Sequence, residues 1–241
     1  SIIFNWCFYY VLRVMTKALL IGFELELYSK NEVNMIFFYL DFLFVYMDSN
    51  RTVIKGKFPP EVRDLLHGIG TSKKKVKISS YHKTVFNQVE WAQGMRLYSR
   101  GMFRMVSALM LRDVLPNPNV ANDTLAQRYE NRFKMFNGLQ IPKRLTYEDF
   151  ARSTQVDEEA KSEQILTNAS ETFQEAQKTF KRLSESEFAS EKVKADCANM
   201  IKTCVANSLA NTMFLKLEGN ANIEFVNQFH RQAPVVKVTK K

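Results

Sequence analysis

The stretch HGIGTSKKK, residues 67–75, contains the glycines and lysines from which phosphate-binding loops are built. A P-loop requires Gly, four residues and then Gly-Lys-Ser/Thr, so that backbone amides surround a phosphate and the lysine reaches it. Here Gly70 is followed by Thr-Ser. A loop that binds the pyrophosphate of acetyl-coenzyme A requires Gln or Arg three residues before Gly-x-Gly, and Leu65 occupies that position. We therefore expect this chain to bind no cofactor.

Histidines and cysteines do not form a recognisable catalytic or metal-binding pattern. His67 lies in the glycine-rich stretch, His82 opens the next helical pattern and His230 lies near the C-terminus, so no base accompanies a nucleophile. Cys197 and Cys204 share a helix face without a nearby His or carboxylate pattern, and we expect them to be buried thiols. The sequence predicts no catalytic centre and no metal site, so we do not expect an enzyme.

The cysteine count indicates the compartment. With Cys7 the chain has three cysteines, an odd number that matches neither a disulfide framework nor a CxxC metal site. This favours a reducing compartment, cytosol or nucleus. The chain begins without Met and without the basic region of a signal peptide, and we interpret it as the C-terminal piece of a longer protein.

Lysines 73, 74, 75 and 77 are the strongest charge feature of the chain. Residues 51–83 contain nine Lys or Arg and two acidic residues, so they hold +7 of the formal net charge of +9. Several cations in a loop attract polyanions without a fixed geometry. Lys73, Lys74, Lys75 and Lys77 could therefore contact RNA or the ribosome, serve as a nuclear import signal, or belong to a solvated linker.

The segment RYENRFKMFN, residues 128–137, combines arginines with aromatic residues. Arg128 and Arg132 are four residues apart, and Tyr129, Phe133 and Phe136 lie on an adjoining stripe. Arginines and aromatic residues are enriched at the centres of protein interfaces. The segment is therefore either a partner interface or an amphipathic helix packed within the chain.

Helical periodicity extends over most of the sequence. Apolar residues recur at helical spacing in residues 33–47, and aromatic residues on the other sides indicate a helix covered nearly all round. That run is too short for a membrane span and contains Asp41, so a core helix is favoured. A longer pattern keeps one apolar face over residues 85–109. Gly94 and Gly101 lie near this face, so another helix should approach closely there.

Residues 165–183 and 193–217 each carry an apolar stripe, and the short connection between them predicts an antiparallel helical hairpin. Leu209 and Met213 are assigned to the stripe of the second helix. The tail APVVKVTKK predicts a short strand or extended arm. The fold class is therefore mainly α, with packed helices, a C-terminal antiparallel helical hairpin and a strand-like tail.

Two S-x-x-E capping boxes predict helix starts. Ser29 with Glu32 precedes the helix at residues 33–47, and Ser184 with Glu187 precedes the second helix of the hairpin. By composition the chain divides into apolar core helices at 1–48, a basic flexible linker at 49–81 and a helical region at 82–241. We find no sequence repeat with a fixed period.

GFELELYS, residues 22–29, keeps two carboxylates inside the most apolar part of the chain. If the segment were the last turn of a helix, Glu24 and Glu26 would lie about 200° apart around its axis, and one solvent-exposed stripe could not hold both. Either each carboxylate is solvated or paired within this chain, or one faces a cation on another subunit.

FELELYS with the following aromatic helix, RGMFRM at 100–105, RYENRFKMFN and APVVKV together resemble the C-terminal part of the large auxiliary subunit of the N-terminal acetyltransferase NatC, the Mak-type family. The resemblance is in order and spans most of the chain. It implies a helical, non-catalytic scaffold that holds a catalytic acetyltransferase subunit and a small Sm-like subunit in the cytoplasm.

The resemblance further implies that the complex acetylates nascent chains beginning with Met and a hydrophobic residue, at the ribosome. Acetyl-coenzyme A would be bound by the catalytic partner. A different class of function, a basic helical protein that binds RNA or the ribosome alone, remains an alternative. The scaffold hypothesis makes Glu24, Glu26, Arg128, Tyr129, Arg132, Phe133 and Phe136 candidate partner contacts. On this hypothesis Glu24 or Glu26 meets a basic group of a partner or of the N-terminal region that this piece lacks.

Overall fold

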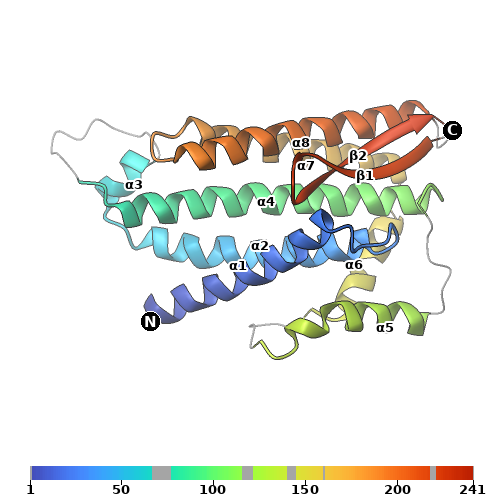
Figure 1. Ribbon diagram of the computed structural model, residues 1–241, viewed down its shortest axis with the longest axis horizontal. Helices are drawn as coiled ribbons and strands as arrows, with labels where there is room; N and C mark the ends of the chain where they lie inside the picture. Colours follow the sequence, from blue (N-terminus) through green and yellow to red (C-terminus); the bar gives the residue numbers. More distant parts are fainter. Residues whose placement is uncertain are drawn as a thin grey trace.

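The computed structural model describes residues 2–66, 77–115, 122–139, 145–159, 161–217 and 221–240. The chain is mainly α, as the sequence predicts (Figure 1). The described elements are α1 (Ile2–Glu24), α2 (Val33–Gly56), α3 (Pro60–Leu66), α4 (Ser80–Leu111), α5 (Asn122–Phe133), the 3-10 helix η1 (Lys134–Phe136), α6 (Tyr147–Glu159), α7 (Ser162–Glu185), α8 (Glu191–Lys216), β1 (Ala221–His230) and β2 (Ala233–Lys240).

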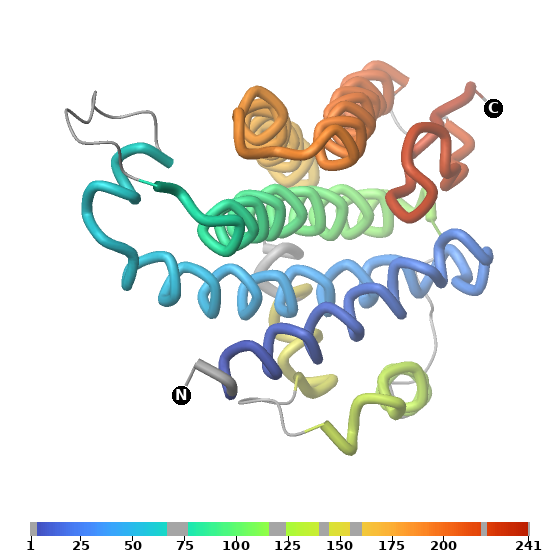
Figure 2. The backbone as a smooth tube through the Cα atoms, turned by 60° about the vertical axis from the view of Figure 1, so that its left-hand side comes forward, coloured from blue at the N-terminus to red at the C-terminus, as the bar shows by residue number. Residues whose placement is uncertain are grey.

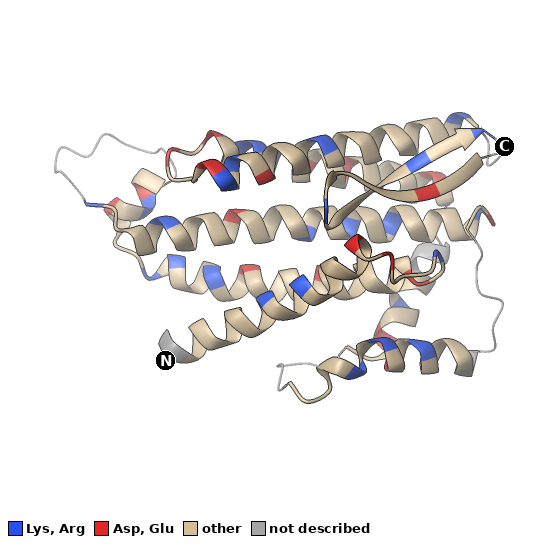
Figure 3. Ribbon diagram, in the orientation of Figure 1, with Lys and Arg blue, Asp and Glu red and all other residues tan. Residues whose placement is uncertain are grey.

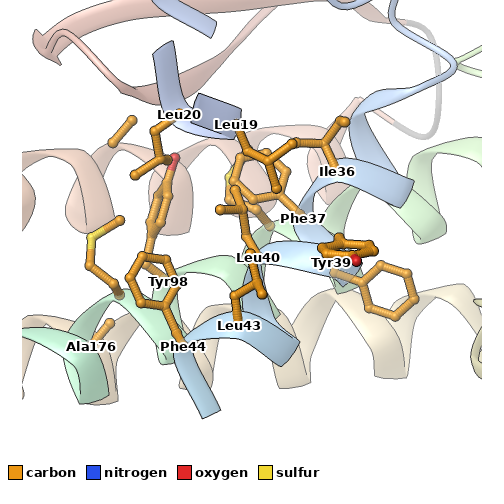
Figure 4. Close-up of a cluster of buried hydrophobic side chains, with 14 of the residues drawn as sticks. Leu19, Leu20, Ile36, Phe37, Tyr39, Leu40, Leu43, Phe44, Tyr98 and Ala176 are labelled. Carbon is orange, nitrogen blue, oxygen red and sulfur yellow. The ribbon is translucent and has the colours of Figure 1, made fainter. Parts of the chain in front are cut away.

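Helix α4 is the centre of the fold because it packs against α2 on one side and α7 on the other (Figure 2). Helix α1 covers α2, and α8 lies antiparallel beside α7, which confirms the predicted hairpin. Buried side chains from these helices form one hydrophobic core, in which Phe44 of α2, Tyr98 of α4 and Ala176 of α7 meet (Figure 4). The core therefore joins the predicted N-terminal and C-terminal regions.

The close approach predicted at the glycines of α4 is confirmed. A Cβ built on Gly94 would lie 2.6 Å from the Phe180 ring, and one on Gly101 would lie 2.7 Å from the Phe173 ring. Both distances are shorter than a carbon–carbon contact, so the two rings of α7 rest on the α4 backbone where the side chain is missing. The two glycines thus set the distance between α4 and α7.

Helix boundaries differ from those predicted at three places. Residues 49–56, assigned to the linker, are the last two turns of α2. Glu32 accepts a hydrogen bond from the Ser29 amide, but α2 begins only at Val33. The predicted start at Ser184 is wrong, because α7 continues to Glu185 and the side chain of Ser190 caps α8. A four-residue motif does not show whether a preceding helix has already ended.

Helix α8 is rotated relative to its predicted orientation. Its buried face contains Asn207 and Asn211, whereas Leu209 and Met213 are exposed. Asn211 donates to the Leu166 carbonyl and to Ser170 of α7. Both polar atoms of the Asn207 side chain and the Asn211 side-chain nitrogen find partners, which lowers the cost of burying these amides, and the apolar side chains on the other side of α8 are left at the surface.

The strand-like tail pairs with β1 as an antiparallel hairpin, and the sequence did not predict β1. Asn207 of α8 accepts from the Val236 amide at 2.8 Å and donates to the Pro234 carbonyl at 3.3 Å. Tyr98 of α4 donates to the same carbonyl at 2.8 Å. The Asn207 side chain therefore bonds to β2 as a neighbouring strand would, and this fixes the hairpin on the helices.

Helix α1 has two different faces. Tyr9, Leu12 and Met15 are buried, whereas Trp6 and Tyr10 on the other side are exposed and stack on one another. In the described part of the chain, Phe4–Glu24 is the one segment long and apolar enough to cross a membrane, and 44% of its 18-residue apolar window is buried. The buried face packs on α2 as expected for a core helix.

Candidate protein interaction site

The GFELELYS segment forms the turn that ends α1. The Leu27 amide donates to the Gly22 carbonyl at 2.9 Å, and the Glu26 amide donates to the Phe23 carbonyl at 3.3 Å. These two bonds are the Schellman arrangement, in which the residue after the helix cap adopts a left-handed backbone conformation. Glu26 has that conformation, with φ of 54°. Nothing in the sequence indicates this conformation, because glycine is the usual residue at this position.

The turn answers the question raised by the two carboxylates. Helix α1 ends at Glu24, so Glu24 and Glu26 do not have to share a helical stripe. Glu24, Leu25, Glu26 and Leu27 are all exposed, whereas Phe23 before them is buried. The alternation in FELELY comes from a left-handed turn and not from a strand.

Tyr28 folds back onto α1 and holds the turn in place. Its hydroxyl donates to the Leu19 carbonyl at 2.8 Å, and its ring meets the edge of Phe23 with centroids 4.8 Å apart. A Cβ on Gly22 would lie 2.2 Å from the ring, so the glycine is required for this contact. Burial raises the pKa of Tyr28 to about 12, although Arg132 opposes the shift. The hydroxyl therefore remains a hydrogen-bond donor at neutral pH.

Arg132 is paired within the chain. It donates to Glu32 from Nη2 at 2.7 Å and from Nε at 3.1 Å, and its guanidinium lies 5.2 Å from the centre of the Tyr28 ring. Burial alone would raise the pKa of Glu32, but hydrogen bonds from Ser29 and Arg132 outweigh it and hold the pKa below its usual value. Arg132 thus connects α5 to the base of the turn.

The aromatic residues of RYENRFKMFN are also packed inside the chain. Tyr129, Phe133 and Phe136 are buried, and the Phe133 ring stacks on Tyr39 of α2 with centroids 4.1 Å apart. Buried rings are not available to another protein without rearrangement, so the structure favours the alternative of an amphipathic helix packed within the chain. Arg128 is the exposed member of this predicted set.

The carboxylates of the turn remain at the surface. Glu24 accepts from Gln232 of the hairpin at 3.4 Å, and in the described residues neither Glu24 nor Glu26 makes an ion pair. The acidic end of α1 lies beside the β1–β2 turn (Figure 3). Asn227 of β1 donates to the Phe23 carbonyl at 2.8 Å, so the hairpin braces the turn from one side.

Leu25 and Leu27 are functional candidates that the sequence analysis missed. They are 59% and 58% exposed on either side of Glu26. Exposed apolar side chains that lie together mark protein interaction sites. Their alternation with the glutamates is the signal in the sequence that marks them.

The lysine cluster lies mainly outside the described residues. Lys73, Lys74 and Lys75 fall in the segment 67–76, as does His67. Lys77 is exposed and comes two residues before Ser79, which caps α4 by accepting from the His82 amide. Lys77 therefore remains accessible to an anionic partner beside a fixed helix end.

The described residues form no constellation suited to catalysis. No group of three or more His, Cys, Asp or Glu in these ranges could hold a metal ion. Burial raises the pKa of Cys197 to about 12 and raises that of Cys204 as well, so both are neutral thiols at physiological pH. A concave region of about 530 Å³ beside the end of α7 is lined by Phe86, Phe188 and Lys181 among others. Its Lys181 forms an exposed ion pair with Glu185 one turn further along α7.

The structure is a set of packed helices that presents an exposed turn, and Tyr28 and Asn227 hold that turn in place. These features define a protein of the helical scaffold class. A family model described as NAA35-like with TPR repeats matches residues 1–236. The chain belongs to this family, and the resemblance to the large NatC auxiliary subunit is confirmed.

The chain is similar to the proteins named N-alpha-acetyltransferase 35, NatC auxiliary subunit, of Homo sapiens and Rattus norvegicus. It is 27% identical to each over 242 residues, which cover 97% of this chain and 32% of each relative. It spans about a third of their length. An auxiliary subunit is distinct from a catalytic one, in agreement with the prediction that the chain is not an enzyme.

Solved structures share the fold. The crystal structure of the apo NatC complex contains a chain that matches with a TM-score of 0.75 and 14% identity, over 98% of this chain and 41% of that chain. The NatC complex bound to Gag peptide and CoA gives a TM-score of 0.75 with the same identity and coverage. The same helical arrangement therefore occurs within an assembled complex.

Proposed function

We propose that this chain is part of the non-catalytic scaffold of a NatC complex and holds the catalytic acetyltransferase subunit. The observation that carries the proposal is the family match over residues 1–236, together with relatives that are named auxiliary subunits. The complex would acetylate nascent proteins that begin with Met and a hydrophobic residue, and acetyl-coenzyme A would be bound by the catalytic partner. A small Sm-like subunit would complete the assembly.

The proposed contact is the turn at the end of α1. Glu24 and Glu26 are exposed and have no cationic partner in the described residues. An exposed carboxylate is solvated at little cost, and it gains most from a cation that arrives with a partner and excludes water. Glu24 and Glu26 are therefore the proposed partner contacts, whereas Arg132 and the buried rings of α5 serve to position the turn.

Cytoplasmic ribosome association is a second part of the proposal. Lys77 is exposed, and the sequence places Lys73, Lys74 and Lys75 just before it. Contacts with RNA phosphates weaken steeply as salt rises, because binding releases counterions. We expect salt-sensitive ribosome binding that is reduced when these lysines are replaced by Gln, with the assembled complex left intact.

The proposal is tested by reconstitution of the full-length auxiliary subunit with the catalytic and Sm-like subunits. Size-exclusion chromatography should give one ternary complex that survives ribonuclease, and acetylation of a Met-Leu peptide should depend on the auxiliary subunit. A chain that elutes alone, or that associates only through RNA, would refute the scaffold function. For the contact, Glu24→Gln with Glu26→Gln should weaken assembly.

The matched control for the carboxylate variant is Glu171→Gln with Glu175→Gln. These two glutamates lie on the exposed face of α7 and change the net charge by the same amount. Equal assembly of both double variants would rule out the two carboxylates as the contact while leaving the scaffold function in place.

A further inference from the structure

We propose that residues 24–27, here called the Leu-Glu knob, insert their two leucines into an apolar pocket on a partner subunit whose rim carries Arg or Lys. The inference rests on the proposed scaffold function and names the chemistry of the surface that the turn recognises. It makes Leu25 and Leu27 the anchors of the contact and gives the glutamates the role of orienting it.

The first support is the position of Leu27. In a Schellman turn the residue after the left-handed one usually packs its apolar side chain against the last helical turn. Here the Tyr28 ring covers Gly22, where Leu27 would otherwise pack. Leu27 is left 58% exposed and Leu25 59% exposed. The local packing is therefore complete without the two leucines, which remain available for another surface.

The second support is the rigidity of the knob. Its backbone is fixed by the amides of Leu25, Glu26 and Leu27, each of which donates to a carbonyl of α1. Tyr28 holds one end of the turn on Leu19, and Asn227 of the hairpin holds the Phe23 carbonyl. A side chain presented on a fixed backbone loses less entropy on binding than one on a free loop.

The third support is the identity of residue 26. A side chain in the left-handed region costs energy that glycine avoids, so Glu26 is less favourable for folding than Gly would be at this φ of 54°. Backbone strain of this kind is concentrated at functional sites. No described residue forms an ion pair with Glu26, so within the described part of the chain no ion pair of its side chain offsets this cost.

The fourth support is charge. The chain has a formal net charge of +9, and the knob carries two carboxylates that alternate with its two leucines. A surface complementary to it must be apolar at the centre and cationic at the edge. An anionic lipid surface would repel the glutamates, so a basic protein pocket is the favoured occupant.

The test measures binding of the full-length auxiliary subunit, immobilised, to the purified catalytic and Sm-like subunits in separate titrations. Leu25→Ser with Leu27→Ser should weaken one of the two affinities about tenfold or more, as expected when two anchors are truncated. The matched control, Leu209→Ser with Met213→Ser, removes two apolar side chains of α8 that are 59% and 49% exposed, and it should leave both affinities unchanged.

Glu26→Gly separates binding from folding. It should raise the thermal midpoint of the auxiliary subunit because the strain is relieved, and yet weaken the same affinity that the leucine variant weakens. Glu26→Gln should weaken that affinity without the rise in midpoint, and should make binding less sensitive to salt.

Three results would overturn the inference. If wild-type protein binds but the double serine variant binds equally well, the leucines are not anchors. If Glu26→Gly raises the midpoint and keeps full affinity, the glutamate has no role in recognition. If wild-type protein binds neither subunit, the proposed scaffold function itself fails, and the knob inference fails with it.

Discussion

A single methyl group at Gly22 should loosen the turn from the helix that carries it. In Gly22→Ala the new Cβ would lie 2.2 Å from the Tyr28 ring, so the ring must move. Movement breaks the hydroxyl bond to Leu19, worth about 0.5–1.5 kcal/mol, and the contact with Phe23, worth about 0.5–1.5 kcal/mol. The higher helix propensity of Ala offsets up to about 1 kcal/mol of this effect, so we expect the free energy of unfolding to fall by about 1 kcal/mol.

A double-mutant cycle with Tyr28→Ala isolates this contact. Without the ring, Gly22→Ala should stabilise the protein by up to about 1 kcal/mol, which gives a coupling energy of about 2 kcal/mol. Urea unfolding of the four proteins measures it. The pKa of Tyr28, about 12 when packed, should also fall towards 10.0 in Gly22→Ala, and tyrosinate absorbance follows that change. Additive free energies, or stabilisation by Gly22→Ala alone, would refute the reasoning.

Three further predictions concern α8 and the cysteines. Asn207→Ala should lower the free energy of unfolding by about 2 kcal/mol and speed hydrogen exchange in β2, because a buried strand amide loses its acceptor; slow exchange would contradict it. Leu209→Gln should change the free energy of unfolding by less than about 0.5 kcal/mol because Leu209 is exposed. Phe214→Ala should lower it by about 3–5 kcal/mol in the same denaturant titration because Phe214 is buried. A larger effect for Leu209→Gln than for Phe214→Ala would support the orientation of α8 predicted from sequence. Under native conditions at pH 8, iodoacetamide should modify the exposed Cys7 and spare the buried Cys197, because burial raises the pKa of the Cys197 thiol to about 12. Peptide mass spectrometry measures the modification of each cysteine.

The candidate site was predicted from sequence only in part. Glu24 and Glu26 were identified because charge in an apolar segment is visible without a structure, and both prove to be exposed. Leu25 and Leu27 were missed because leucines in an apolar segment are assigned to the core by default. Tyr129 and Phe133 show the opposite case, since aromatic residues beside arginines occur both in interfaces and in cores, and only packing on Tyr39 distinguishes the two.

The sequence by itself determined the helical class, the antiparallel pairing of α7 with α8 and the close approach at Gly94 and Gly101. The helices and their pairing follow from the spacing of apolar residues along the chain, and the close approach follows from the missing side chain of each glycine, so all three can be predicted without a structure. Only the tertiary structure decided which face of α8 is buried, because Asn207 can enter the core only where β2 supplies its hydrogen bonds. It also decided that Glu26 leaves α1 through a left-handed turn, since the ring that makes this turn possible comes from Tyr28 folding back over Gly22.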